Sequence, residues 1–246
     1  MKMKIWAVVA AGFFTMMPAL KAAILTGTPE ALLTSGGLDR FSAGLFYQQL
    51  RRPIETETGF EMELQARTYE AVLGLDIMPW LTLYGSAGGS DARFRNISDY
   101  GQDRFSWAAG FNMNIWQWTG YGDMPVWRLN FKTRADVARY ETETGNLEIK
   151  WTDYSVAFPV GYEVVFARSP ESITELDHLE IFLGPALSYI DGRYQQGGQS
   201  YDFEEQNSFG VMGGVSLFIT KTLFVGASAS YFDRFLIRGG VGYSFE

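Results

Sequence analysis

Side chains of opposite character alternate along most of the chain, and this period of two limits the possible folds more than any other feature. In residues 105–115, apolar side chains at odd positions alternate with small or polar ones at even positions. In residues 127–137, the even positions carry mostly charged side chains. A helix would mix the two sets on every face, whereas a strand separates them onto opposite faces. The pattern therefore predicts an all-β chain.

The alternation predicts about ten strands, with eight and twelve as the alternatives. Besides the two rows above, six segments alternate regularly, namely residues 40–49, 81–90, 179–190, 209–219, 223–231 and 235–245. Two more segments, residues 61–75 and 147–162, change phase part-way along. A β-bulge near Thr68 and another near Thr152 would reconcile the two halves of each segment.

The connections predict that the two ends of the sheet differ. Short turns are expected at one end, for example at residues 78–80 and 220–221. Long polar loops are expected at the other end, over residues 50–60, 95–104, 140–146 and 191–206. Short turns on one side and long loops on the other are typical of outer-membrane barrels.

The first 22 residues have the order of a secretory signal peptide. Lys2 and Lys4 precede an apolar stretch over residues 5–17, and residues 18–22 form a small-residue exit that Leu20 and Lys21 interrupt. The apolar stretch is too short to span a bilayer as a helix. We therefore expect a signal peptide at residues 1–22, a leader segment at 23–38 and one barrel domain at 39–246.

Composition excludes several classes of function. The chain has 246 residues, no cysteine and a formal charge of −8. Without cysteine it has no disulfides, thiolate metal sites or thiol nucleophiles. An acidic chain without a cluster of Lys and Arg is a poor candidate for binding nucleic acid through phosphates.

The composition of the second face separates a membrane barrel from a soluble barrel or sandwich. A soluble barrel would expose that face to water and fill it with charged residues. Here it is rich in small residues, which suit a crowded interior: Gly44, Ser86, Gly88, Ala108, Gly110, Gly184, Ser188, Gly210, Gly214, Gly226, Ser228, Ser230, Gly240 and Gly242. The other face carries Trp, Phe, Leu, Val and Tyr almost without charge, as contact with lipid requires. We therefore predict a closed antiparallel transmembrane β-barrel, because hydrocarbon offers no partner to an unpaired strand edge.

Aromatic residues gather where the short turns are expected. Amphipathic rings settle at the level of the lipid headgroups. We therefore predict an aromatic girdle made of Trp80, Trp116, Trp118, Tyr121 and Trp127.

The residues of the last predicted strand resemble the C-terminal end of a known family of barrels. The signal, the alternating strands and the ending Gly239-Gly240-Val241-Gly242-Tyr243-Ser244-Phe245 resemble the small outer-membrane barrels of the OmpA and OmpW type over residues 39–246. In that family an aromatic last residue, preceded by alternating apolar ones, resembles the signal read by the barrel-assembly machinery. The resemblance implies such a C-terminal assembly signal at Val241, Tyr243 and Phe245, although Glu246 follows the last aromatic residue here.

Charged residues on the alternating strands are candidates for the barrel lumen. They are Glu61, Glu63, Arg67, Arg128, Lys132, Arg134, Asp136, Glu148 and Lys150. Because both signs lie on neighbouring strands, cross-strand ion pairs would plug the lumen. Alternatively, Arg128, Lys132 and Arg134 would line a narrow path that prefers anions.

These features favour a structural or surface-interaction barrel with a plugged lumen, a narrow porin-like channel being the alternative. An outer-membrane hydrolase is less favoured, because the single histidine, His178, falls at the short-turn end and is expected to be exposed or interfacial. We expect no enzyme activity, cofactor or metal. The acidic residues Asp99, Asp103, Asp191, Asp202, Glu204 and Glu205 are expected in solvated loops, since they lack EF-hand-like spacing. The expected partners are outer-membrane lipids, lipopolysaccharide and the assembly machinery; the surface ligand stays open.

Overall fold

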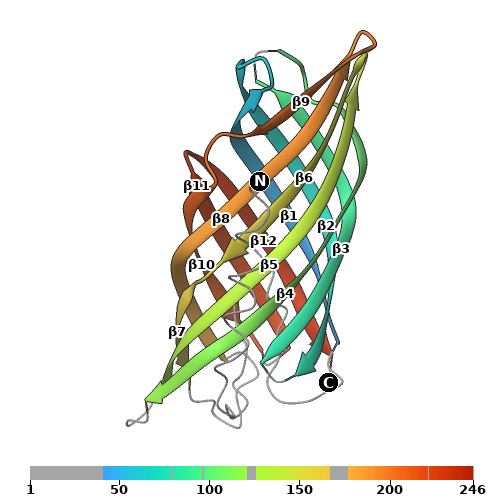
Figure 1. Cartoon of the computed structure of the whole chain (residues 1–246). Coiled ribbons are helices and arrows are strands. Elements are labelled where there is room, and N and C mark those ends of the chain that lie inside the picture. The colour runs from blue at the N-terminus through green and yellow to red at the C-terminus, as the bar shows by residue number, and fades with distance from the viewer. Residues whose placement is uncertain are drawn as a thin grey trace.

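A closed wall of antiparallel strands forms the molecule in a computed structural model (Figure 1). The structure describes residues 41–78, 80–95, 97–120, 126–166, 177–220 and 222–245, so the predicted signal peptide and leader segment lie outside it. The strands are β1 (Phe41–Thr56), β2 (Glu61–Met78), β3 (Leu81–Phe94), β4 (Gln102–Gly120), β5 (Val126–Thr144), β6 (Leu147–Ala157), β7 (Val160–Val165), β8 (His178–Gln196), β9 (Gln199–Glu205), β10 (Phe209–Phe218), β11 (Leu223–Phe232) and β12 (Arg234–Phe245). No helix of the described residues is long and apolar enough to span a membrane.

The twelve strands occupy ten positions in the ring, which is the predicted number. β6 and β7 share one position, because both pair with β5 and β8 in a continuous register on either side of residues 158–159. β9 and β10 share another position, because both pair with β8. β12 pairs with β1 and closes the ring.

The barrel narrows toward its upper end. The hairpin of β11 and β12 ends at Phe232 and Arg234, while β1 and β8 continue upward. Above that hairpin, β9 pairs directly with β1, with Ile54 opposite Glu205. Two of the ten strands therefore drop out, and eight continue. Pro53 lies where β1 changes partner from β12 to β9, a position that suits a residue without a backbone N–H.

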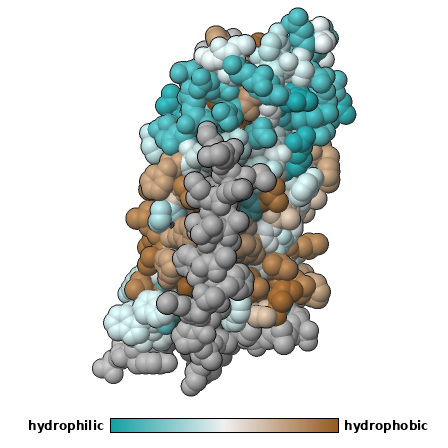
Figure 2. Space-filling view, viewed as in Figure 1, coloured by the Kyte–Doolittle hydropathy of each residue, from teal (hydrophilic) through white to brown (hydrophobic). Residues whose placement is uncertain are grey.

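The outer face of each strand changes character along its length. On β2, Tyr69 and Leu73 face outward in the lower part, and Glu61 occupies the same face above them. Hydrophobic side chains cover the lower part of the molecule and hydrophilic ones the upper part on the side in view (Figure 2). The lower part therefore has an apolar outer band, and the upper part a polar outer surface.

This change of surroundings, and not a shift in register, explains the two changes of phase in the sequence. The pairing of β2 with β1 runs unbroken past Thr68, and that of β6 with β5 runs unbroken past Thr152. The predicted bulges at these residues are therefore wrong. The described irregularities lie elsewhere, in β2 between Asp76 and Met78 and in β4 between residues 103 and 107 and between 114 and 116.

The predicted long polar loops are mostly strand. Residues 50–56, 140–144 and 191–196 continue β1, β5 and β8 beyond the apolar band. The hairpins end in tight turns, for which Gly145 (φ 58°) and Gly197 (φ 60°) supply the left-handed backbone conformation. Among the described residues at this end, the longest connection is formed by Arg95 and residues 97–101. The sequence suggested loops because the outer face of each strand becomes polar and the inner face apolar above the band. This is the reverse of the pattern expected for a strand in the membrane.

Apolar side chains fill the interior of the upper part. This upper apolar cluster consists of Leu50, Ile54, Leu64, Ala66, Ala92, Phe94, Ala138, Tyr140, Leu147, Ile149, Trp151, Ile190 and Phe203. Its largest member, Trp151, is fully buried and stacks on Tyr140 with ring centroids 5.0 Å apart. The upper part thus resembles a water-soluble barrel, apolar inside and polar outside. The lower part is apolar outside, and its interior holds polar side chains beside smaller apolar clusters such as the one around Phe46, Phe218 and Phe224.

Candidate functional site: the barrel interior

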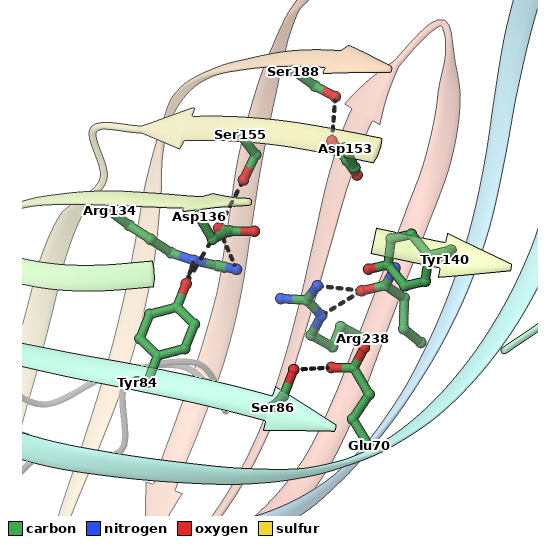
Figure 3. Close-up of polar contacts among 11 residues, drawn as sticks. Glu70, Tyr84, Ser86, Arg134, Asp136, Tyr140, Asp153, Ser155, Ser188 and Arg238 are labelled. Atoms are coloured by element: carbon green, nitrogen blue, oxygen red, sulfur yellow. Dashed lines mark hydrogen bonds and ion pairs between the residues drawn. The ribbon is translucent and has the colours of Figure 1, made fainter. Parts of the chain in front are cut away.

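Polar side chains converge inside the barrel at the level of the apolar band (Figure 3). Arg134 of β5 donates from Nε to the Tyr84 hydroxyl over 2.9 Å, and its Nη2 lies 2.8 Å from Asp136 Oδ1. The Tyr84 hydroxyl donates to the same carboxylate oxygen over 3.2 Å, and Ser155 donates to it over 2.8 Å. Asp136 therefore gathers groups from β3, β5 and β6.

A second set of contacts lies beside the first and involves β1, β2, β3, β5 and β12. Ser86 donates to Glu70 Oε2 over 2.9 Å. Arg238 of β12 donates from Nε to Gln48 Oε1 over 2.7 Å, and Gln48 Nε2 lies 3.5 Å from the Tyr140 hydroxyl. The contact of Arg238 with Gln48 crosses from the last strand to the first and so supports the closure of the ring.

Ion pairs occupy the lower end of the interior. Arg128 Nη1 lies 3.0 Å from Glu163 Oε1, and Lys132 pairs with Glu180. The side chains of Glu163 and Glu180 are fully buried. Gly161 leaves the space that the Glu180 carboxylate occupies, since a Cβ there would collide with it. Together with Arg134 beside Asp136, each of the three cations predicted to line an anion path therefore faces a carboxylate.

His178 lies inside the barrel and is buried, so the expectation of an exposed or interfacial histidine is wrong. Its ring stacks on Phe218 with centroids 3.8 Å apart, and its Nδ1 lies 2.9 Å from Asp177 Oδ2. His178 is the first residue of β8 and lies on the inward face of the strand. Its ring is therefore at the lower end of the barrel interior.

A buried ion pair marks the height at which the barrel narrows. Arg52 Nε of β1 lies 3.4 Å from Glu205 Oε1 of β9, and the guanidinium lies over the Phe232 ring at 3.8 Å. Ser188 donates to Glu205 Oε2 over 3.0 Å and to Asp153 Oδ1 over 3.3 Å. Burial raises the pKa of Glu205, which lies above the apolar band, to about 7. The expectation that Glu205 lies in a solvated loop is therefore wrong.

The nine predicted lumen charges divide between the two faces of the wall. Arg128, Lys132, Arg134 and Asp136 lie inside. The other five lie on the outer surface of the upper part, so their prediction as lumen residues is wrong: Glu61, Glu63, Arg67, Glu148 and Lys150. The reason is the change of surroundings, because above the apolar band the polar face of each strand is the outer one.

Two partners that the sequence analysis missed complete the lower ion pairs. Glu163 lies between outward-facing neighbours on β7, and Glu180 lies between Leu179 and Ile181 on β8. The period of two could have predicted both residues as inward-facing. Glu163 lies on the same face of β7 as Gly161, and Glu180 lies on the same face of β8 as Phe182.

Aromatic side chains mark both edges of the apolar band. At the lower edge, Trp116 and Trp118 are exposed, and Trp118 packs edge-on against Trp127 with centroids 5.0 Å apart. Trp80 is half-buried, and Tyr121 lies outside the described residues. An upper row, which the sequence analysis did not predict, includes contacts of Tyr47 with Tyr69 at 5.0 Å and of Tyr154 with Tyr189 at 6.5 Å.

The C-terminal residues predicted as an assembly signal lie on the outer face of β12. Val241, Tyr243 and Phe245 are exposed, and the rings of Tyr243 and Phe245 lie 5.0 Å apart. Their role in assembly stays a prediction.

Two hollows open on the outer surface of the upper part. One, of about 460 Å³, is lined by Arg139, Glu148, Lys150, Asp191, Gly192, Arg193, Gln195 and Asp202. The other, of about 470 Å³, is lined by Glu55, Thr56, Glu57, Asp191, Asp202, Phe203 and Glu204. Within the described part of the chain, no group of three or more His, Asp or Glu side chains has the arrangement of a metal site.

The thickness of the apolar band matches a membrane. On β8 the outward apolar residues run from Leu179 to Tyr189. At a rise of about 3.3 Å per residue and a tilt near ~45°, such a run spans roughly 23 Å, close to the ~25 Å apolar band of outer-membrane barrels. A closed antiparallel ring with this band, small inward residues and aromatic edges defines an outer-membrane β-barrel protein. Such barrels extend their longer segments toward the outside of the cell, and here strands such as β8 and β9 rise above the apolar band, which favours an upper part that faces outside.

Comparison with known proteins finds similar solved structures at low sequence identity. No protein-family model and no curated protein sequence matches the chain. The outer membrane protease OmpT from Escherichia coli is similar over 85% of this chain and 97% of its own, with 11% identity and a TM-score of 0.40. The translocator domain of autotransporter NalP from Neisseria meningitidis is similar over 86% and 89%, with 11% identity and a TM-score of 0.37. Ail, the attachment invasion locus protein of Yersinia pestis, is similar over 84% and 98%, with 9% identity and a TM-score of 0.27.

The class of outer-membrane β-barrels was predicted from the sequence and is confirmed by the closed antiparallel ring and its apolar band. The narrower resemblance to barrels of the OmpA and OmpW type stays a prediction.

Proposed function

We propose that this chain is a structural and surface-interaction barrel whose lumen is closed by its own side chains. The observation that carries the proposal is the pairing of the interior cations. Arg128, Lys132 and Arg134 each lie against a carboxylate, so none of them presents a bare charge to a passing ion. A path that prefers anions would need these cations to face water.

The upper apolar cluster supports the same proposal. It lies directly above the polar network, and side chains such as Trp151 and Phe94 in it are fully buried. An ion leaving the lower lumen would have to cross this dry layer, which is costly for a charge. The exposed turns and polar walls of the upper part are then the surfaces available to partners outside the cell.

Conductance in planar lipid bilayers tests the closed lumen against the rival porin-like channel. We expect no stepwise openings from the unmodified protein. Lys132→Glu alters the interior and Lys150→Glu, its matched control, alters the outer surface. Steady openings whose ion preference reverses in Lys132→Glu and stays unchanged in Lys150→Glu would establish the channel and overturn the closed-lumen proposal.

The proposed role includes assembly through the C-terminal strand and excludes catalysis. We expect Phe245→Ala to lower the yield of folded barrel in outer-membrane fractions, because the exposed aromatic ring is the last one on the outer face of β12. Ile237→Ala, an equally exposed change on the same face, is the control. Equal yields from both variants would argue against a C-terminal signal at Phe245.

A further inference from the structure

Three arginines lie on adjacent strands just above the upper aromatic row. Tyr47 and Tyr69 face each other across β1 and β2 at the edge of the apolar band. One outward position higher, Arg67 lies opposite Gln49 on one side and Asp91 on the other. One position higher again, Gln65 lies between Arg51 and Arg93. Successive outward positions are about 7 Å apart, so these guanidinium groups lie at the height of lipid headgroups.

A tyrosine from the connection between β3 and β4 holds two of these side chains in place. The guanidinium carbons of Arg67 and Arg93 lie 4.0 Å and 4.3 Å from the centroid of the Tyr100 ring. Arg93 also donates from Nε to Gln65 Oε1 over 3.0 Å. These contacts use the faces of the guanidinium groups and one N–H, so the terminal N–H forks stay available for oxygen atoms.

The charges around the three arginines leave an excess of positive charge. Among the described residues, no ion pair within 4.0 Å joins Arg51, Arg67 or Arg93 to a carboxylate. Asp91, opposite Arg67, accepts a hydrogen bond from the Gly101 backbone and interacts electrostatically with both Arg67 and Arg93, so one carboxylate is shared between two guanidinium groups. Glu63, higher on the same wall, is already engaged by Arg95 at 3.1 Å and by Arg234 at 3.5 Å.

We propose that Arg51, Arg67 and Arg93 bind the phosphoryl groups of a lipid in the surrounding outer leaflet. The planar guanidinium group can donate two parallel hydrogen bonds to two oxygen atoms of one phosphoryl group. The acyl chains of the same lipid molecule would then pack against the Tyr47–Tyr69 pair below the arginines. The inference rests on the proposed function, because it requires a barrel seated in the membrane with its upper part outward, and it names one partner of that surface.

Titration of the full chain in dodecyl maltoside with diphosphoryl lipid A, followed by native mass spectrometry, tests the site. The test variant carries Arg51→Gln, Arg67→Gln and Arg93→Gln. The control variant carries Arg139→Gln, Lys150→Gln and Arg193→Gln, which removes the same charge from the wall of β5, β6 and β8. We expect the test variant to bind about 10- to 100-fold more weakly, since each cation at a membrane surface contributes on the order of tenfold or less. The control should change less than about threefold.

Inorganic pyrophosphate distinguishes a lipid headgroup from free phosphate. Millimolar pyrophosphate should leave lipid binding nearly unchanged, because the acyl chains add contacts that the free ion lacks. Equal weakening in both variants, unchanged binding in the test variant, or full competition by pyrophosphate would overturn the proposal. Bilayer conductance of the test variant separates the failure of this proposal from the failure of the proposed function. A closed lumen shows no stepwise openings, whether or not the lipid binds.

Discussion

Arg52 and Glu205 form a buried ion pair between β1 and β9, with Nε and Oε1 3.4 Å apart and both side chains almost fully shielded from solvent. The pair lies where β12 ends and β9 takes its place beside β1. It therefore joins the two strands whose meeting turns a ten-stranded ring into an eight-stranded one.

Removing the cation of this pair should destabilise the barrel. Arg52→Met keeps much of the side-chain volume and leaves the Glu205 carboxylate buried without its partner. We expect a loss of about 3–5 kcal/mol in the free energy of unfolding by urea in detergent micelles at pH 8. Arg193→Met removes an exposed pair with Asp202 and should leave the free energy of unfolding nearly unchanged. Similar losses in the two variants would show that the buried pair has no special role.

Stability should fall as pH rises through the titration of Glu205. Burial raises the pKa of this carboxyl from 4.5 to about 7 in the folded protein. Between these two values the folded state binds more protons than the unfolded state, so the free energy of unfolding decreases with rising pH. The contribution lost by pH 8 is on the order of 3 kcal/mol. Glu205→Gln should remove this slope in urea unfolding measured from pH 5 to 8, and parallel slopes in both proteins would contradict the assignment.

The fold was predictable because the period of two is a local property of the chain. Ten strands and a small-residue inner face followed from alternation alone, for example from Gly184 and Ser188 on β8. The face of the charged residues did not follow, because alternation does not say where a strand leaves the membrane. Lys132 and Lys150 look alike in sequence, yet one lies inside the barrel and the other outside.

The narrowing of the barrel from ten strands to eight could not be predicted from the sequence, for a different reason. The pairing of Ile54 with Glu205 joins strands far apart in the chain, and no local pattern records such a contact. The ion pairs of the lower lumen were half predictable, since the cations were found while Glu163 and Glu180 were missed.

A charge placed on the apolar band should be far more costly than the same charge higher on the same strand. Leu183 and Gln195 both face outward on β8, with Leu183 66% exposed at the level of the band. We expect Leu183→Arg to lower the free energy of unfolding in lipid vesicles by about 2–4 kcal/mol, because the guanidinium would enter hydrocarbon. Gln195→Arg should change it by less than about 0.5 kcal/mol. Equal effects would mean that the two positions have the same surroundings.

The most direct test of the account is the surroundings of one outward row, measured residue by residue in lipid. Because the chain has no cysteine, single cysteines at Ile181, Leu183, Leu187, Asp191 and Gln195 can each carry a nitroxide label without further changes. Collision rates of these labels with oxygen and with a water-soluble nickel complex should show lipid at the first three positions and water at the last two. A uniform profile along β8, wet or dry throughout, would contradict the claim that one barrel crosses the membrane below and stands in water above.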